Sequence, residues 1–336
     1  MDRGRGAMVD GLNEDRVLGV LRGLAAGDAL GAGYEFRPAF SEREPVDMIG
    51  GGLGDFAPGE WTDDTSMVVV IARALSAARG QFTEQAADAM VGDWYLWAQT
   101  APDVGAQTSA VLRQAHRLAG EGNGEPAGGA PGARHARRAA EQVHQRTGRS
   151  GGNGSLMRTA PVALATLRRP ARDTFEMALA VSALTHFDPE AGEACGLWSV
   201  AIRHAVLTSE LDVRAGLALL DAPRAALWEE RIAAAEAAQT RDFAQNGWVV
   251  QAFQSAWCAI ATTRTPDPAR HLVDALETAV RGGQDTDTVA AIAGSLIGAA
   301  LGRYAIPARW QKILHGWPGL AAEDLDRLAL QLAAAR

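Results

Sequence analysis

The chain has 336 residues, of which 47% are hydrophobic and 21% charged, and it carries a formal net charge of −8. This acidic balance argues against a general electrostatic attraction to nucleic acid. No apolar run reaches the roughly 18 residues of a membrane-spanning helix, and Met1–Gly6 lacks the apolar segment of a signal peptide. Cys195 and Cys258 lie among small and apolar residues and are expected to be buried reduced thiols. These features predict a cytoplasmic protein without a membrane partner.

Residues 1–12 are rich in glycine and charge, so we expect a flexible N-terminal tail ahead of one domain spanning residues 13–336. A helix is predicted to start near Asn13, because apolar residues recur after it at helical spacing. The helix continues into a stretch of small residues spaced four apart, which is typical of closely packed backbones. Asp28 and Glu35 are acidic residues within this apolar stretch. Taken alone, each fits a solvated surface position as well as a functional one.

The most distinctive stretch is Trp61–Ser66, in which two adjacent aspartates and three hydroxyl side chains precede an apolar run. Asp285–Thr288 repeats this design before a second apolar run. Each cluster is typical of a helix N-terminus, where Asp and Thr side chains accept hydrogen bonds from unpaired backbone N–H groups. Capping uses one or two oxygens, whereas each cluster offers several. If the two helix starts meet in space, they form a site for two divalent cations, which prefer oxygen ligands.

The segments between the clusters are predicted to be helical, since alternation of period two is scarce. A helix is expected over residues 63–79, and the next one, Thr83–Trp97, carries an aromatic stripe expected to pack in the core. Residues 120–134 are of low complexity, and we interpret them as a loop within one domain. The glycine-rich stretch Gly148–Arg158 can present backbone N–H groups to an anion, although it does not match a phosphate-binding loop. His186, taken alone, is more typical of a packed histidine than of a ligand.

The second acidic cluster opens a helix made almost entirely of small and apolar residues. A helix that is apolar all round belongs at the centre of a bundle. With short loops between the helical segments, the sequence predicts an all-α, single-domain fold, a compact orthogonal helical bundle around a central buried helix pair.

Five motifs occur in the order typical of the ADP-ribosylglycohydrolase family, which includes the dinitrogenase reductase-activating glycohydrolase. They are Gly27–Gly31, Trp61–Thr65, Gly152–Arg158, Thr185–His186 and Gly283–Thr288. The resemblance covers roughly residues 14–305, and it implies an all-helical fold of the ADP-ribosylglycohydrolase type with a binuclear magnesium or manganese centre.

The resemblance also implies roles for individual residues. The residues that match metal ligands are Thr62, Asp63, Asp64, Asp285, Asp287 and Thr288. The residues that match the substrate-binding side are the diphosphate loop Ser150, Gly151, Gly152 and Asn153, together with His186. The candidate catalytic carboxylates are Glu35, Asp63, Asp103 and Asp287, and the sequence does not rank them.

Two positions depart from the family pattern. Gln284 stands between the glycines and Asp285, where the family commonly has Gly-Gly-Asp-Thr-Asp-Thr. Ala106–Thr108 reads Ala-Gln-Thr where Asn-Thr-Thr is usual. The second departure bears on local substrate contacts and not on the metal ligands.

The implied reaction is hydrolysis of the glycosidic bond of an ADP-ribosylated protein or small molecule, with ADP-ribosyl-arginine as the first expectation. The transition state is expected to resemble an oxocarbenium ion, and two Mg²⁺ or Mn²⁺ ions would orient the sugar and lower the pKa of a water. Nucleic acid is implied as a partner only when it is ADP-ribosylated, and the chain is expected to be a monomer. A catalytically silent ADP-ribose-binding or structural relative and a two-metal nucleotide phosphohydrolase are the alternatives. The retention of both acidic clusters argues against the catalytically silent relative.

Overall fold

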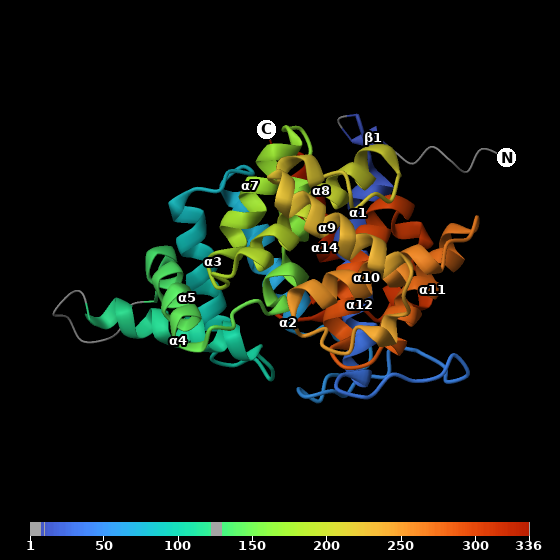
Figure 1. Cartoon of the computed structure of the whole chain (residues 1–336), viewed down its shortest axis with the longest axis horizontal. Coiled ribbons are helices and arrows are strands. Elements are labelled where there is room, and N and C mark those ends of the chain that lie inside the picture. Colours follow the sequence, from blue (N-terminus) through green and yellow to red (C-terminus); the bar gives the residue numbers. More distant parts are fainter. Residues whose placement is uncertain (1–7, 10, 122–129, 336) are drawn as a thin grey trace.

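The computed structural model describes residues 8–9, 11–121 and 130–335, and its regular secondary structure is almost entirely helical (Figure 1). The α-helices of this part of the chain are α1 Glu14–Gly31, α2 Asp63–Ala77, α3 Glu84–Trp97, α4 Ala106–Glu121, α5 Ala133–Thr147, α6 Ala160–Ala165, α7 Ala171–Ser182, α8 Pro189–Thr208, α9 Ala222–Glu236, α10 Val249–Thr262, α11 Pro268–Arg281, α12 Thr286–Leu301, α13 Ala308–Gln311 and α14 Ala322–Ala333. Two antiparallel pairs of two-residue strands complete it: β1 Met8–Val9 with β2 Leu12–Asn13, and β3 His315–Gly316 with β4 Leu320–Ala321. The expectation of an all-α fold is confirmed.

Several helix boundaries follow from local capping. Asn13 accepts a hydrogen bond from the backbone N–H of Arg16, and Thr83 does the same for Ala86, so the predicted starts of α1 and α3 are confirmed. The end of α2 was predicted two residues too late. The chain leaves the helix after Ala77 because Arg79 and Gly80 adopt left-handed backbone angles, with φ of 52° and 74°.

Two predicted irregular segments lie partly outside the described residues. Of the N-terminal tail, residues 1–7 and 10 are not described, and Met8–Val9 pairs with the residues just before α1. Of the low-complexity loop at 120–134, residues 122–129 are not described. The helices on either side, α4 and α5, pack against each other and project with α3 at one end of the molecule (Figure 1).

The core is organised around α1 and α12, which run antiparallel and make the most extensive helix contact of the described chain. Their backbones touch because glycines face the partner helix. A Cβ atom added at Gly23 would lie 2.3 Å from the carbonyl oxygen of Gly294, and one at Gly27 would lie 2.0 Å from that of Ala290. The predicted central helix pair is thus present, and it can form only where side chains are missing.

The remaining helices enclose this pair. The helices α8, α10 and α11 pack on α12, and α14 packs on α1. Trp94 of the aromatic stripe is fully buried, as predicted, and its indole N–H donates to the backbone carbonyl of Met67 at 3.3 Å. Cys195 and Cys258 are buried free thiols, also as predicted. No helix in the described part of the chain is long and apolar enough to cross a membrane.

Candidate functional site

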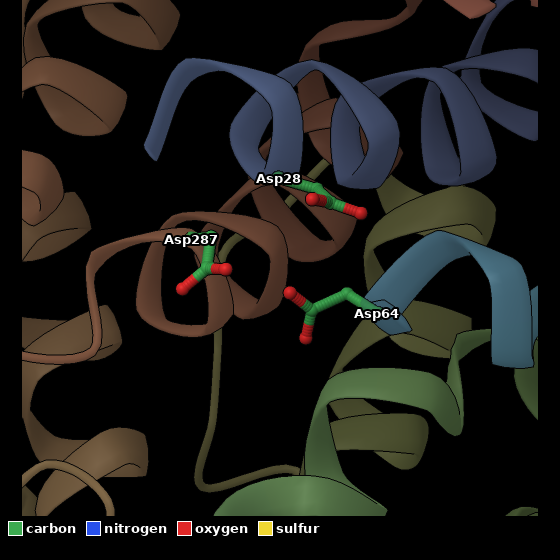
Figure 2. A group of neighbouring side chains, drawn as sticks. All are labelled: Asp28, Asp64 and Asp287. Carbon is green, nitrogen blue, oxygen red and sulfur yellow. The ribbon is translucent and has the colours of Figure 1, made fainter. Parts of the chain in front are cut away.

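The two acidic clusters meet where the C-terminal end of α1 reaches the N-terminal ends of α2 and α12. Asp28, Asp64 and Asp287 come from these three helices and face one another (Figure 2). One carboxylate oxygen of each lies within 4.8 Å of the others, and all three residues are buried. The backbone contact between α1 and α12 therefore sets the spacing of Asp28 and Asp287.

Asp28 is fully buried and supports the start of α2. Its Oδ1 accepts hydrogen bonds from the backbone N–H and the hydroxyl of Thr62, at 2.9 and 2.8 Å. Its Oδ2 accepts the same two kinds of bond from Thr65, at 3.0 and 2.6 Å. Both oxygens are thus occupied by protein donors, so Asp28 acts as the cap of α2 rather than as a free ligand. The expectation that Asp28 occupies a solvated surface position is therefore wrong.

The first cluster does not cap its own helix. Thr62 at the start of α2 makes no side-chain capping hydrogen bond with that helix, because Asp28 accepts the N–H groups there. At the start of α12, Asp287 Oδ1 accepts the backbone N–H of Thr288 at 2.9 Å, so the second cluster keeps a local hydrogen bond to its own helix. The capping interpretation is therefore wrong for the first cluster, in which Asp64 Oδ1 has no hydrogen-bond partner and remains available to a ligand.

Glu35 joins the site from the turn that follows α1. One oxygen of Glu35, one of Asp285 and one of Asp287 lie within 4.8 Å of one another. The turn is held by two backbone hydrogen bonds, from Phe36 N–H to the carbonyl of Gln284 at 2.6 Å and from Gln284 N–H to Arg37 at 2.7 Å. Phe36 and Gln284 both have positive φ, 58° and 63°. Such strain persists where surrounding contacts hold it, so Gln284, a departure from the family pattern, takes part in placing Glu35.

Asn153 and Asn246 hold Asp285 in place. The side-chain amide of Asn153 donates to Asp285 Oδ2 at 2.7 Å and to the backbone carbonyl of Asn246 at 2.9 Å. The side-chain oxygen of Asn246 accepts the backbone N–H of Asp285 at 3.0 Å. The glycine-rich loop is thereby tied to the second acidic cluster, a link that the sequence did not predict.

Crowding of buried carboxyl groups raises their pKa values. Burial, and then the charges of Asp285 and Asp103, raise the pKa of Glu35 to about 8. Burial, and then Asp103, raise the pKa of Asp63 to about 7. The pKa values of Asp64 and Asp287 are well above the ordinary range, chiefly through burial. Each shift measures how unfavourable the ionised cluster is without compensating positive charge.

The donor set fits divalent cations. Asp64 Oδ1 is buried and has no hydrogen-bond partner, which is rare for a carboxylate oxygen. Among the described residues no ion pair involves Asp63, Asp64, Asp285 or Asp287. Carboxylates and hydroxyls without a protein cation are the oxygen donors that Mg²⁺ and Mn²⁺ take. The hydroxyl of Thr62 lies 3.4 Å from Asp64 Oδ2 and 3.5 Å from Asp287 Oδ2, so the cluster gathers the predicted ligands of both sides.

The carboxylates open into a cavity of about 470 Å³, here called the central cavity. Its walls include Glu35, Asp63, Asp103, Asn153, His186 and Asp287. Asp63 Oδ2 accepts the backbone N–H of Gly105 at 3.3 Å, which connects α2 to the segment after Asp103. Most of the predicted site residues are thus brought to one chamber.

His186 is buried and its ring is oriented by a relay. Arg158, which can only donate, gives a hydrogen bond to Thr185 Oγ1 at 2.6 Å, and Thr185 Oγ1 lies 2.7 Å from His186 Nδ1. With Arg158 donating to its oxygen, the hydroxyl of Thr185 can give its own proton to Nδ1, an arrangement that puts the ring proton on Nε2, near Gly152 and Gly154 in the cavity wall. Burial, and then Arg158, lower the pKa of His186 well below its ordinary value, which favours the neutral ring.

The side chain of Gln107 holds the glycine-rich loop in place through hydrogen bonds. Its amide donates to the backbone carbonyls of Ser150 and Thr185 at 2.8 and 3.2 Å, and its oxygen accepts the N–H of Gly152 at 3.4 Å. The Ser150 hydroxyl contacts His144 Nδ1 at 2.6 Å and not the central cavity. The N–H of Asn153 is also used, by the carbonyl of Gly247 at 3.1 Å. The second departure from the family pattern, at Ala106–Thr108, thus supplies a structural brace.

Comparison with known proteins decides the family. The family model described as ADP-ribosylglycohydrolase matches residues 10–336. The chain belongs to the ADP-ribosylglycohydrolase family. The expected resemblance and the expected type of enzyme, a hydrolase of the ADP-ribosylglycohydrolase kind, are thereby confirmed.

Individual relatives of this ADP-ribosylglycohydrolase cover nearly all of it. It is 31% identical to the ADP-ribosylarginine hydrolase Tri1 of Pseudomonas putida (strain GB-1), over 95% of this chain and 78% of that protein. It is 31% identical to the ADP-ribosyl-[dinitrogen reductase] glycohydrolase of Rhodospirillum rubrum, over 88% of this chain and 89% of that protein. A solved structure described as an ADP-ribosylglycohydrolase-related protein complex matches with a TM-score of 0.66 at 29% identity, over 95% and 97% of the two chains.

Four residues of this ADP-ribosylglycohydrolase site were missed as functional residues: Asp28, Gln107, Arg158 and Asn246. Asp28 and Arg158 lie within the family motifs, and a charged residue among small and apolar neighbours was the available signal for both; both prove to be buried. Nothing in the sequence around Asn246 signals its role, since its partners lie 39 and 93 residues away.

Proposed function

We propose that the chain hydrolyses the glycosidic bond of ADP-ribosyl-arginine and releases ADP-ribose, with a binuclear Mg²⁺ or Mn²⁺ centre at the acidic cluster. The single observation that carries the proposal is the meeting of the two acidic clusters with a buried, unpartnered oxygen on Asp64. The name of the relative from Pseudomonas putida supports an ADP-ribosylated arginine as the substrate, and that of the relative from Rhodospirillum rubrum supports the release of ADP-ribose from an ADP-ribosylated protein.

The ligands proposed for the two cations are Thr62, Asp63, Asp64, Asp285, Asp287 and Thr288. Two groups of carboxylates, one with Asp64 and one with Glu35 and Asp285, share Asp287, an arrangement suited to two neighbouring cations. When bound, the cations would supply Lewis-acid chemistry, polarising ribose hydroxyls and lowering the pKa of a water.

Two roles remain for the chain's own carboxylates, namely proton transfer and the placing of charge near the anomeric carbon. Glu35 and Asp103 lie in the cavity wall outside the proposed ligand set, so they are free to take a proton from the attacking water or to give one to the leaving group. Asp63 and Asp287 are the other proposed catalytic carboxylates. Their main role would be to place negative charge near the anomeric carbon.

ADP-ribose is proposed to extend from the central cavity across Gly151, Gly152 and Asn153. The N–H at Nε2 of His186 is the donor available to a diphosphate or ribose oxygen. Ser150 supports this loop from outside, through His144. A further cavity of about 480 Å³ beside Trp248 continues beyond Gly152 and Gly247 and offers an aromatic surface to the base.

The test is incubation with ADP-ribosyl-arginine, with and without Mg²⁺ or Mn²⁺, and identification of the products by mass. Free ADP-ribose formed only with metal is the expected result. AMP would show a phosphohydrolase, and no product with any ADP-ribosyl conjugate would indicate a silent protein. Asp285→Ala and Asp287→Ala should abolish metal-dependent turnover with little loss of fold. The cytoplasmic location and the monomeric state stay predictions.

A further inference from the structure

A second cavity adjoins the carboxylates, and no residue of the glycine-rich loop lines it. It has a volume of about 570 Å³ and is called here the tryptophan cavity, after Trp61, Trp97 and Trp317 in its wall. Asp63 and Asp103 line both this cavity and the central cavity. These two aspartates therefore stand at the boundary between two chambers, and neither the proposed cation ligands nor the proposed ADP-ribose contacts account for the second chamber.

Ring contacts and hydrogen bonds join the walls of the tryptophan cavity to one another. The rings of Trp97 and Trp317 meet edge to face, with centroids 6.5 Å apart. The indole N–H of Trp61 donates to the backbone carbonyl of Trp317 at 3.2 Å. The hairpin of β3 and β4 is attached to the start of α2, since the N–H of Trp61 donates to the carbonyl of His315 at 3.0 Å. This hairpin, near the C-terminal end of the chain, closes one side of the cavity.

The tryptophan cavity combines aromatic side chains with negative charge. Carboxylates in its wall come from Glu60, Asp63, Asp103 and Asp324, and no lysine or arginine lines it. Asp324 is partly compensated by Arg327, which lies outside the cavity wall. Aromatic faces attract cations, and carboxylates pair with a guanidinium through two parallel hydrogen bonds. A planar cation on an aliphatic stem fits such a wall better than a neutral or anionic group.

A glycoside hydrolase needs room on both sides of the bond that it cleaves, for the sugar and for the leaving group. We propose that the tryptophan cavity is the leaving-group subsite and that it takes the arginine side chain to which ADP-ribose is attached. This inference rests on the proposed function and names what that function leaves open, which is how the leaving group is recognised. Thr100, an exposed residue of the cavity wall, then lies beside the aliphatic stem.

In the hydrolysis, the oxygen of water forms a bond to the anomeric carbon and the carbon–nitrogen bond breaks. The electron pair of that bond leaves with the guanidine nitrogen, which takes up a proton, while the second proton of water stays on the new hydroxyl of ADP-ribose. The departing group is thus a guanidinium, and it is released into a cavity lined by carboxylates.

The inference is tested with Thr100→Arg, which places a competing guanidinium in the tryptophan cavity. Gln99→Arg is the matched control, since it adds the same charge at a neighbouring exposed residue outside the cavity wall. We expect Thr100→Arg to lower kcat/KM for an ADP-ribosylated arginine peptide about tenfold or more, with ADP-ribose affinity unchanged. Gln99→Arg should behave as the unmodified chain.

A binding experiment separates failure of this inference from failure of the proposed function. Saturation-transfer NMR is recorded with L-arginine amide, and with its uncharged analogue citrulline amide, on protein saturated with ADP-ribose. Binding of the arginine compound alone, lost in Thr100→Arg and weakened in Glu60→Gln, supports the subsite even where no turnover is seen. Equal signals from both compounds, or equal behaviour of Thr100→Arg and Gln99→Arg, overturn it.

Discussion

Asp28 Oδ1 accepts hydrogen bonds from both the backbone N–H and the hydroxyl of Thr62, across 34 residues of sequence. The carboxylate near the end of α1 thereby caps α2, so the acidic side chains of α2 remain available to bind a ligand. The fold positions the site through this replacement, because a helix start whose own side chains cap it has fewer oxygens to offer.

Removing one of the hydrogen bonds that Asp28 accepts should weaken the fold measurably. In Thr65→Val the side chain keeps its shape but loses the hydroxyl that donates to Asp28 Oδ2 at 2.6 Å. A hydrogen bond to a charged group contributes about 1.5–3 kcal/mol, and we expect a loss of that size in the free energy of unfolding, measured by urea denaturation. Thr65→Ser keeps the hydroxyl and should lose clearly less. Equal losses in both variants would contradict the role given to the hydroxyl.

The cation-free protein should become less stable as the pH rises from about 4.5 to 8. The folded-state pKa values of Glu35 and Asp63 are raised to about 8 and about 7. The folded state therefore binds more protons than the unfolded state over this window, so its stability falls with increasing pH. Melting temperatures measured in EDTA across pH 5 to 8 test this. Mg²⁺ or Mn²⁺ should raise the melting temperature more at pH 8 than at pH 5, and a pH-independent effect would speak against binding at these carboxylates.

Asp64→Asn should have opposite effects on the protein with and without cations. The substitution removes a buried charge whose Oδ1 has no hydrogen-bond partner, so the melting temperature in EDTA is expected to rise. It also removes a proposed ligand, so the increase in melting temperature on adding Mn²⁺ should shrink. Asp326→Asn is unsuited as a control because Asp326 pairs with the buried Arg22; Asp55→Asn, in an exposed turn, should change neither quantity.

The contact between α1 and α12 should tolerate no added methyl group. In Gly23→Ala the new Cβ would lie 2.3 Å from a backbone carbonyl oxygen, and we expect a loss of about 3 kcal/mol or more in the free energy of unfolding. Gly92→Ala in α3 is the matched control. Its Cβ would have one neighbour, at 3.9 Å, so a gain of about 0.5–1 kcal/mol from helix propensity is expected. Similar effects at both positions would contradict the described backbone contact.

The relay from Arg158 to His186 should be visible in the histidine tautomer. In ¹⁵N NMR spectra of histidine-labelled protein, His186 is expected as a single neutral tautomer protonated at Nε2, with no titration between pH 6 and 8. Thr185→Val removes the hydroxyl between Arg158 and Nδ1, so both tautomers should become populated and KM for the substrate should rise. Thr185→Ser preserves the hydroxyl and should retain the single tautomer. A His186 ring protonated at Nδ1 in the unchanged protein would refute the relay.

The sequence predicted the helices and the residues of the acidic clusters because both depend on local patterns. Asn13 and Thr83 cap helices within three residues of themselves. The supports of the site depend instead on contacts distant in sequence. The side chain of Asn246 reaches Asp285 across 39 residues, and Asn153 reaches it across 132. No periodicity or motif of a single sequence encodes which loop will brace which carboxylate.

The glycine contact between α1 and α12 also has a thermodynamic consequence for binding. Because backbone touches backbone there, α1 and α12 cannot separate to let Asp28 and Asp287 move apart. Their mutual repulsion is held in the folded protein and is relieved only when positive charge arrives. The chain is thus preorganised for the proposed cations: little conformational entropy would be lost on their binding, and the relief of repulsion would add directly to their affinity.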